Sequence, residues 1–459
     1  MQEAIFLIKI NRSRIRELQE KEERRFVDAR PKSSALFQRA KKSLLAGVPM
    51  NWMVKWAGPF PVFVANAKGA HITDVDGHEY VDFCLGDSGA MFGHSLKIVA
   101  DTIKTQADNG ITMMLPTEDS VLVGEELARR FGLPFWQISM TATDANRFSI
   151  RLAREITGRK KILVFNGCYH GSVDEALIWL EDGAVRPGPT NIGPAIDPSM
   201  TTQAIEFNDV RALERALSSE DIACVLCEPA MTNIGIILPE EGYHDALREI
   251  TERYGTLLIL DETHTICVGP GGYTGEHGLR PDMLTIGKPI AGGVPAAAYG
   301  ISEEVAERVR LHTEAKMRTS ASDSGIGGTL SGNALAIAAM RANLEKVMTK
   351  EAYDRMIRLS KRFTEGVDEI IKSRDLPWHV IRLGARAEYR FSPEIPRNGI
   401  EAEAAEDFDL DRLMHLMALN RGILLTPFHS MALVSPEITE KDIDYHTKVF
   451  AECVDLLIG

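Results

Sequence analysis

Long hydrophobic runs are missing from this chain of 459 residues. No apolar stretch approaches the roughly 18 residues that a membrane-spanning helix needs. The N-terminal segment AIFLI is short and is followed by Lys9, so we expect neither a signal peptide nor a membrane anchor. The sequence therefore predicts a cytoplasmic protein with no membrane partner.

Cysteine and positive charge are also scarce. Six cysteines fit a reducing compartment. Cys224 and Cys227 have CxxC spacing, but residues three apart on a strand point to opposite faces and no second pair completes a site, so we expect no metal. A net charge of −13 argues against a nucleic-acid partner.

The length exceeds what one hydrophobic core needs, so two domains are expected. Residues 1–45 are charged and helix-like, which predicts a helical arm that is solvated or packs on a partner subunit. Residues 46–98 form the first part of a small domain and contain GAHITDVDGHEYVDF. Its alternating pattern around Asp76 and Gly77 predicts a β-hairpin.

Residues 99–335 alternate short apolar strands with helical stretches. The strands are WQISM, KILVF, CVLCEP, TLLILD and AAAYGIS. Strands buried on both faces between helices predict a parallel or mixed α/β sheet. Residues 336–459 are mainly helical with one strand, RAEYRF, so the chain ends together form a smaller α+β domain.

Polar residues follow several of these strands. Asp261 and Glu262 end TLLILDE, where a carboxylate caps a helix or pairs with a buried cation. Lys288 follows another apolar run, and a buried lysine is costly unless it is paired or its charge is not permanent. Tyr169 and His170 follow KILVF, where such a pair serves packing or chemistry.

The segment WQISMTATDANRFSIRLAREITG predicts a strand, a tight turn and a helix. Thr141 or Thr143 can cap that helix. A helix that opens at the end of a parallel strand offers free N–H groups and a positive dipole end to an anion.

The motifs GCYHG, EPAMTNIG, DET, GKPIAGG and GTLSGN follow one another along the chain. In this order they resemble the fold-type I pyridoxal-phosphate enzymes, specifically class III aminotransferases of the glutamate-1-semialdehyde aminomutase-like branch. The resemblance runs from about residue 35 to the end. It implies a mostly parallel, seven-stranded sheet flanked by helices, bound pyridoxal 5′-phosphate, and a homodimer with shared active sites.

The resemblance also implies roles for four residues. Lys288 is similar to the lysine that forms the Schiff base with the cofactor aldehyde. Asp261 resembles the carboxylate that keeps the pyridine nitrogen protonated, so that the ring can absorb electrons. Tyr169 would stack on one ring face, and Thr263 would pack on the other, where relatives often carry Val.

Five further residues lie in the cofactor motifs. His170 belongs to the same turn as Tyr169, and Asn233 matches the asparagine of the family segment EPxxGNxG. Ala142 and Thr143 match a phosphate-binding turn that usually has the sequence Ser-Gly-Thr-Glu-Ala and here is TATDA. Thr329 resembles the hydroxyl that reaches the neighbouring subunit's phosphate, although it can equally cap a helix.

Two reactions share such a site. A transaminase moves an amino group from a donor amine or amino acid to a carbonyl acceptor in two half-reactions, whereas a 2,1-aminomutase moves it within one molecule. TATDA and Asn166, where the mutases tend to have Glu, favour the transaminase. A non-catalytic relative is a further alternative, but it would be expected to lose Lys288 or Asp261, and both are present.

The substrate is less determined, because carboxylate recognition normally uses an arginine fork. The segments PMNWMVKW and LLTPFHSMALVS lack arginine. Arg386 and Arg390 share one face of the strand RAEYRF with Glu388, which favours a solvated or ion-paired strand over a substrate-facing one. Possible pocket walls, which are also plausible core residues, are Trp52, Lys55 and Trp56. An amine, a β-amino acid or a D-amino acid fits best.

Overall fold

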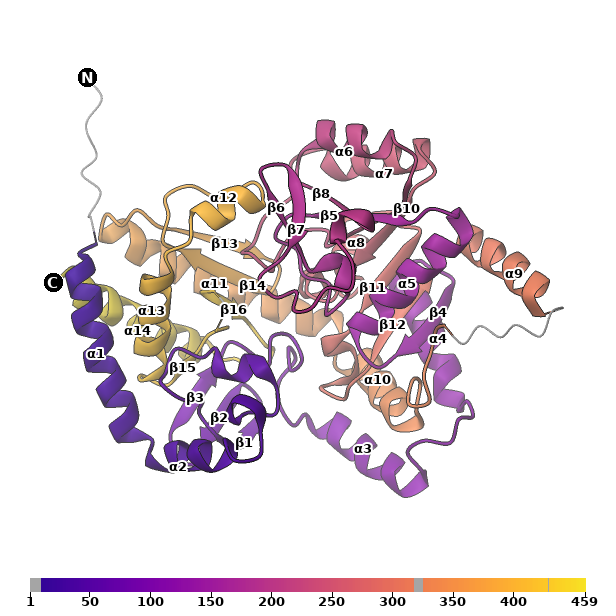
Figure 1. The fold of residues 1–459 in the computed structure, drawn as a ribbon. Helices are drawn as coiled ribbons and strands as arrows, with labels where there is room; N and C mark the ends of the chain where they lie inside the picture. Colours follow the sequence, from indigo (N-terminus) through magenta and orange to yellow (C-terminus); the bar gives the residue numbers. More distant parts are fainter. Residues whose placement is uncertain (1–9, 318–324, 428) are drawn as a thin grey trace. The chain divides into compact units, whose positions relative to one another are not determined.

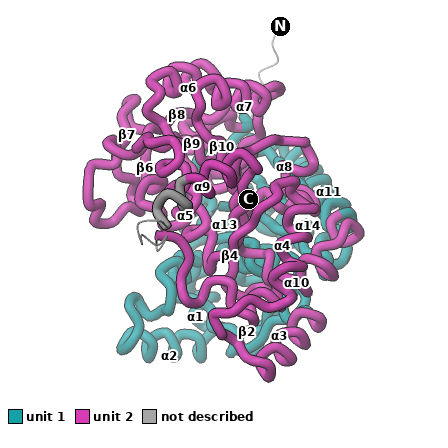
Figure 2. Tube along the Cα trace, turned by 90° about the vertical axis from the view of Figure 1, so that its right-hand side faces the viewer, with its two compact units in different colours: residues 1–96, 354–395, 405–459 teal, residues 97–353, 396–404 magenta. Residues whose placement is uncertain are grey.

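The computed structural model describes residues 10–317, 325–427 and 429–459. Contacts within the chain define two compact units, drawn in teal and magenta in Figure 2. Unit 1 comprises Met1–Leu96, Asp354–Ile395 and Ala405–Gly459, and unit 2 comprises Lys97–Tyr353 and Pro396–Ala404. AIFLI and Phe428 of LLTPFHSMALVS lie outside the described residues. The functional division into arm, large domain and small domain stays a prediction.

Unit 2 is built on a seven-stranded sheet with the order β4-β12-β11-β10-β9-β5-β8 (Figure 1). The strands are β4 (Phe135–Ser139), β5 (Lys161–Phe165), β8 (Thr202–Ile205), β9 (Ile222–Cys227), β10 (Leu257–Asp261), β11 (Met283–Ile286) and β12 (Ala297–Ile301). All run parallel except β12, which is antiparallel to both neighbours. The predicted mostly parallel, seven-stranded sheet is confirmed.

Helices cover both faces of this sheet, which explains why β9 and β10 are buried along their whole length. One core cluster contains Phe148 of α5 (Ala142–Thr157) and Cys224 of β9. Another contains Leu247 of α7 (Tyr243–Arg253) and Cys227 of β9. The two cysteines are free and belong to different clusters, as expected for residues three apart on a strand.

The other elements of unit 2 surround this sheet. They include α3 (Lys97–Asn109), α4 (Glu118–Phe131), β6 (Ile178–Glu181), β7 (Ala184–Pro187), α6 (Val210–Leu217), α8 (Gly272–His277), α9 (Glu303–Met317), α10 (Ala334–Lys346) and α12 (Gly399–Ala404). Helix α10 packs against α3 and α4. No helix in the described parts of the chain is long and apolar enough to span a bilayer.

Unit 1 contains two small sheets, with the orders β1-β2-β3-β15 and β13-β14-β16. Their strands are β1 (Val64–Lys68), β2 (His71–Asp74), β3 (Glu79–Asp82), β13 (His379–Leu383), β14 (Arg386–Arg390), β15 (Ile423–Leu424) and β16 (Met431–Leu433). Strands β2 and β3 pair antiparallel on either side of Asp76 and Gly77, so the predicted hairpin is confirmed. Its longer helices include α11 (Lys350–Ser373), α13 (Phe408–Leu419) and α14 (Glu440–Ile458).

The predicted helical arm includes α1 (Arg12–Ala29), one side of which packs within unit 1; its contact with a partner subunit stays a prediction. Helix α1 contacts α13 and α14, and α2 (Pro31–Ala40) follows it. The physical reason is a buried stripe along α1 that contains Ile15, Leu18 and Phe26. Glu22 of the charged KEERR run lies in this stripe and is buried too, where its carboxylate accepts from Asn420 and Arg421.

Candidate active site

Five parallel strands of unit 2 end at one edge of the sheet, and each is followed by polar residues. These segments are 141–143 after β4, 167–172 after β5, 228–233 after β9, 261–264 after β10 and 287–288 after β11. In open α/β sheets ligands bind at the carboxyl ends of the strands. All the predicted cofactor residues except Thr329 belong to these five segments.

The start of helix α5 is built for an anion. Thr141 is the N-cap, and its hydroxyl accepts a hydrogen bond from the N–H of Asp144, so Thr141 is the capping threonine of the two that were considered. The N–H groups of Ala142 and Thr143 in the first turn have no acceptor within the helix. The TATDA sequence therefore retains the N–H donors of a phosphate turn, because Ala142 adopts ordinary helical geometry.

Close backbone approach joins three of the five segments. The Thr143 hydroxyl accepts a hydrogen bond of 3.1 Å from the N–H of Ser172. Gly171 has a φ of +78°, and a side chain on it would collide with Thr143. A Cβ on Gly287 would lie 2.9 Å from the Cβ of Ala142. Glycine at these two positions lets the segments after β5 and β11 lie against the start of α5.

Asp261 is the buried anion of the site. Its Oδ2 accepts hydrogen bonds from Asn146 Nδ2 at 2.8 Å and from His170 Nδ1 at 3.0 Å, and its Oδ1 accepts one from the N–H of Thr263 at 3.0 Å. Burial alone would raise the pKa of Asp261, but His170, Thr263 and Asn146 lower it to about 2. The carboxylate is therefore ionised at neutral pH.

His170 is the partner of this anion. Burial disfavours the imidazolium, but Cys168 and Asp261 outweigh burial and raise the pKa of His170 to about 10. Asn146 is held in turn by the hydroxyl of Thr285, which donates to its Oδ1 at 2.6 Å. Sequence reasoning missed Asn146, although an asparagine on the buried face of α5 was a signal for it.

Lys288 follows β11 and opens the short 3₁₀ helix Lys288–Ala291. Its φ of 44° is left-handed, a conformation that costs a non-glycine residue energy and that often marks functional sites. The side chain is partly buried, and its Nζ lies 2.5 Å from Nε2 of His264. The structure thus holds this lysine at the same sheet edge as Asp261.

Three other predicted cofactor residues have different settings. Tyr169 is partly buried in the turn after β5. Asn233 is exposed, and its Nδ2 donates to the carbonyl of Gly167 at 3.0 Å. Thr329 is exposed in a turn before α10, but Asn333 is the residue that caps this helix, so the capping alternative for Thr329 is wrong.

The residues of unit 2 fit pyridoxal phosphate, the cofactor that the sequence resemblance implies. The cofactor carries a phosphate, a basic ring nitrogen and an aldehyde. The start of α5 provides N–H donors for an anion, Asp261 provides a carboxylate that is kept ionised, and Lys288 provides an amine. Each of the three cofactor groups therefore has a matching protein group.

Asn166, which had favoured a transaminase, is a structural residue. It is fully buried. Its Nδ2 donates to Glu206 at 2.8 Å, and its Oδ1 accepts from the N–H of Leu180 in β6 at 2.9 Å. Burial also raises the pKa of Glu206, although Ile400 and Asn166 donate hydrogen bonds to it. Asn166 therefore connects the end of β5 to β6 and to Glu206.

The predicted substrate residues all belong to unit 1. Every residue of β14 is buried, so the expectation of a solvated strand is wrong; the two small sheets and α11 cover it too well. Arg386 is 1% exposed, and its Nη atoms contact Ser88 Oγ and Met431 Sδ, both at 2.6 Å. Its Nε has no hydrogen-bond partner within the described residues.

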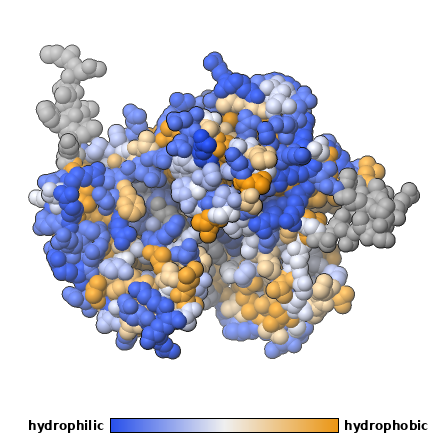
Figure 3. Space-filling model, viewed as in Figure 1, coloured by the Kyte–Doolittle hydropathy of each residue, from blue (hydrophilic) through white to orange (hydrophobic). Residues whose placement is uncertain are grey.

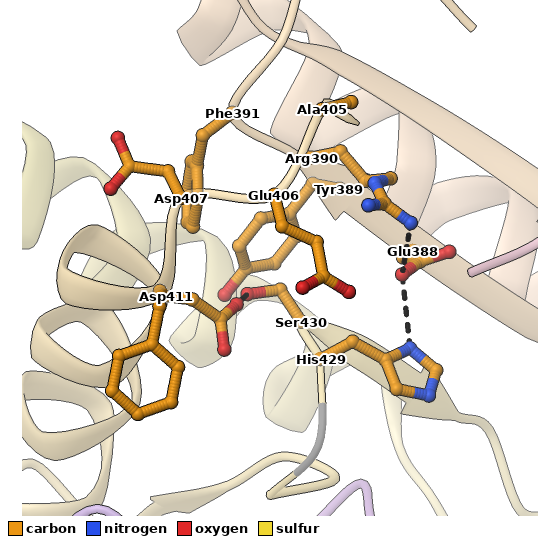
Figure 4. A pocket seen from close by; sticks show the side chains of 11 residues that line it. Glu388, Tyr389, Arg390, Phe391, Ala405, Glu406, Asp407, Asp411, His429 and Ser430 are labelled. Carbon is orange, nitrogen blue, oxygen red and sulfur yellow. Dashed lines mark hydrogen bonds and ion pairs between the residues drawn. The ribbon is translucent and has the colours of Figure 1, made fainter. Parts of the chain in front are cut away.

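Arg390 is paired within its own strand. Figure 4 shows Glu388 between Arg390 and His429, with its Oε1 3.9 Å from Arg390 and 2.9 Å from Nδ1 of His429. The ion-paired alternative therefore describes Arg390. In the N-terminal part of unit 1, Lys55 Nζ lies 5.6 Å from the Trp52 ring centroid, and Trp56 packs on a core cluster.

Comparison with known proteins places these features in a family. The model of the class III aminotransferases matches residues 52–454. A glutamate-1-semialdehyde 2,1-aminomutase from Desulfitobacterium hafniense is 34% identical over 92% of this chain and 96% of its own length. One from Persephonella marina is 32% identical over 93% of this chain and 99% of its own length.

Solved structures agree with this assignment. A glutamate-1-semialdehyde aminomutase from Pseudomonas aeruginosa, a lysine-to-alanine variant in complex with PMP, is 47% identical, covers 98% of this chain and 99% of its own, and has a TM-score of 0.95. An omega-transaminase from Sphaerobacter thermophilus is 27% identical over 93% of this chain and 98% of its own, with a TM-score of 0.83. The chain is a member of the class III aminotransferase family.

Proposed function

We propose that the protein is a pyridoxal-phosphate-dependent 2,1-aminomutase that moves an amino group within one molecule of glutamate 1-semialdehyde. The observation that carries this proposal is similarity to aminomutases over nearly the whole chain, at 34% and 47% identity. The transaminase expected from the sequence is not confirmed, since the omega-transaminase structure is only 27% identical. We therefore prefer the intramolecular reaction.

The TATDA turn and Asn166, the two sequence arguments for a transaminase, are weaker in view of the structure. The TATDA turn keeps a capped helix start with N–H donors, which supports anion binding despite its departure from the usual sequence. Asn166 is buried, and its side chain binds Glu206 and the N–H of Leu180 in β6. The non-catalytic alternative is disfavoured because Lys288 and Asp261 lie at one sheet edge.

The proposed mechanism assigns tasks to three parts of the chain. When bound, the cofactor supplies an aldehyde and an electron-accepting ring. Lys288 is the nucleophile and the base that moves a proton at the substrate carbon. Asp261, ionised and fixed by His170 and Asn146, keeps a proton on the ring nitrogen. The start of α5 binds the phosphate.

The remaining cofactor residues stay proposals with supporting contacts. Tyr169 and Thr263 would cover the two ring faces. Asn233 would act indirectly, because it holds the turn at Gly167 that precedes Tyr169.

Arg386 is our candidate for the substrate carboxylate, since a fully buried guanidinium with an Nε that has no partner in the described residues can still accept an anion. Arg390 is a weaker candidate because Glu388 already pairs with it. Trp52, Lys55 and Trp56 stay candidate pocket walls without a contact that favours them.

A homodimer is part of the proposal. Thr329 is exposed and so is available to the phosphate of a second subunit. The exposed apolar side chains that follow α3 are Ile111, Met113, Met114 and Leu115. Figure 3 shows apolar surface in the region of that helix. Contiguous apolar surface of this kind is typical of subunit interfaces. The six free cysteines are consistent with the predicted cytoplasmic location, which stays a prediction.

The decisive experiment is an assay with glutamate 1-semialdehyde as the only substrate. A mutase forms 5-aminolevulinate without any added amino donor or carbonyl acceptor. Turnover only with a separate donor and acceptor pair, by ping-pong kinetics, would establish the transaminase instead. Arg386→Ala should weaken substrate binding while Arg390→Ala should not. Sedimentation of the active enzyme as a monomer would contradict the dimer.

A further inference from the structure

A continuous chain of short hydrogen bonds leads from Lys288 into the core of unit 2. Lys288 Nζ lies 2.5 Å from Nε2 of His264, and Nδ1 of His264 lies 2.7 Å from Oγ1 of Thr232. The Thr232 hydroxyl donates to Oε1 of Glu228 at 2.6 Å. These residues come from the segments after β9, β10 and β11, and none beyond Lys288 has a role in the mechanism above.

The donors and acceptors of this chain can be assigned from its geometry. When Glu228 is a carboxylate, Thr232 gives its one hydroxyl hydrogen to Glu228 and accepts from His264. Nδ1 of His264 therefore carries a hydrogen, and its Nε2 is the acceptor that faces Lys288. Oε2 of Glu228 is occupied by the N–H of Thr232 at 3.0 Å, which leaves Oε1 as the end of the chain.

We propose that Glu228, Thr232 and His264 form a proton relay to Lys288 that holds one proton, either on the amine or on the buried carboxyl. In one state Lys288 is an ammonium and Glu228 a carboxylate. When the proton moves from Nζ to Nε2, the Nδ1 proton passes to Thr232 and the Thr232 proton to Oε1. The result is a neutral amine and a carboxylic acid, with every atom and charge accounted for.

The surroundings of Glu228 make the protonated state accessible. Glu228 and Thr232 are buried. Burial raises the pKa of Glu228 to about 7; hydrogen bonds from Thr232 and the charge of His170 oppose this rise, and Asp261 adds to it. The thiol of neighbouring Cys227 stays neutral, because burial raises its pKa well above the ordinary value. A carboxyl in this setting can take up a proton near neutral pH.

Glu262 follows Asp261 in the chain, but its own hydrogen bonds exclude it from the relay. Its oxygens accept hydrogen bonds from the Thr265 hydroxyl and from the N–H groups of Tyr273 and Thr274.

Thr232 stands where the family segment EPxxGNxG has glycine, which has no hydroxyl. The relay is thus a feature of this chain that the general pattern does not encode.

The relay adds a step to the proposed mutase mechanism, and its role in catalysis rests on that proposed function. A lysine acts as a nucleophile only as the neutral amine, and a buried relay removes its proton without solvent. His264 would be the immediate acceptor, because its Nε2 touches the reacting nitrogen. Glu228 and Thr232 are positioning residues that act through His264.

The test measures Lys288 without any substrate. The full-length chain, freed of cofactor, is labelled with trace acetic anhydride from pH 5 to pH 11, and acetylation of Lys288 is quantified by mass spectrometry. The exposed Lys361 serves as the internal reference. Because the two one-proton states have equal charge, their ratio does not depend on pH. We expect the labelling rate of Lys288 to rise with pH in acid, to stay level across neutral pH, and to rise again in alkali. The part of the curve across neutral pH is called the level region.

Variants identify the source of the level region. Thr232→Val and Glu228→Gln should abolish it, leaving a single alkaline rise and a rate at pH 7 that is roughly tenfold lower. Thr232→Ser keeps the hydroxyl and should retain it. Thr202→Val is the matched control, because its hydroxyl binds only the carbonyl of Glu175 among the described residues and lies outside the relay. Thermal unfolding checks that each variant is folded.

The outcomes separate this proposal from the proposed function. A single alkaline rise in the wild-type chain, or a level region that survives in folded Thr232→Val and Glu228→Gln, would overturn the relay whatever reaction the enzyme catalyses. If Thr232→Val does not fold, Glu228→Gln and Thr232→Ser decide alone. A level region together with no conversion of glutamate 1-semialdehyde would sustain the relay and overturn the mutase.

Discussion

The ends of β9 and β10 carry two carboxylates in the same structural position, but their pKa values are shifted in opposite directions. Glu228 follows β9, Asp261 ends the neighbouring parallel strand β10, and both are buried. The pKa of Asp261 is lowered to about 2, whereas that of Glu228 is raised to about 7. Burial is common to both and cannot explain the difference.

The difference comes from the partners of each group. Asp261 faces the cationic His170 together with donors from Asn146 and Thr263, and these outweigh its desolvation. Among the described residues, the donors in direct contact with Glu228 are neutral ones, the hydroxyl and the N–H of Thr232. Adjacent strand ends thus provide a permanent anion and a carboxyl that titrates near neutral pH.

The largest effect is expected for Lys288, the amine that the segment after β11 supplies to this sheet edge. Lys288→Ala should lower turnover by roughly 10⁴-fold, because it removes both the nucleophile and the base. The fold should persist, since the side chain is only partly buried. Steady-state turnover and thermal unfolding measure the two properties. A loss of less than tenfold would show that another group does the chemistry.

Replacing the permanent anion tests the first half of the comparison. Asp261→Asn should lower turnover by about 10²- to 10³-fold, since an uncharged amide no longer holds a proton on the cofactor ring. It should also lower the pKa of His170, which Asp261 helps to raise to about 10. The pH dependence of the cofactor's visible absorption in the loaded enzyme reports the ring nitrogen. An unchanged spectrum would contradict this role.

The sequence predicted the α/β sheet and the hairpin, because apolar runs and turn residues are local signals. The cofactor roles came from the family resemblance and stay predictions, although eight of those nine residues lie in the segments at the strand ends. The sequence did not predict that Thr232 and His264 would meet, since they come from different segments and neither follows a strand directly. Nor did it predict the burial of β14, where alternating charges suggested solvent. Contacts between segments distant in sequence decide these features.

Replacing the titrating carboxyl tests the second half. The pKa of Glu228 rises on folding from its ordinary value of 4.5 to about 7. Its stabilising contribution is therefore complete below pH 4.5 and is lost as the pH rises through 7. Glu228→Gln should accordingly gain up to about 3 kcal/mol in free energy of unfolding, relative to wild type, on going from pH 4.5 to pH 8.5. Urea unfolding at the two pH values measures it.

Asp261→Asn provides the opposite sign as a control. The folded pKa of Asp261 lies below its ordinary value of 3.8, so its contribution is present above pH 3.8 and is lost as the pH falls toward 2. The destabilisation caused by Asp261→Asn should thus shrink in acid. If both variants shifted stability in the same direction with pH, the contrast between the two strand ends would be wrong.

The smallest effect concerns the helix that holds Asn146 against Asp261. Thr141 caps α5, and Thr141→Ala should lower the free energy of unfolding by about 1 kcal/mol, because the N–H of Asp144 loses its acceptor. Thr141→Ser retains the hydroxyl and should cost only a few tenths of that. Thr141 is exposed, so no cavity adds to the loss. Urea unfolding at pH 7 measures both variants.

A weaker affinity for inorganic phosphate in Thr141→Ala, with Thr141→Ser unaffected, would further show that the cap orders the N–H groups of Ala142 and Thr143. An equal loss of stability in the two variants would mean that the methyl group and not the hydroxyl supports the helix.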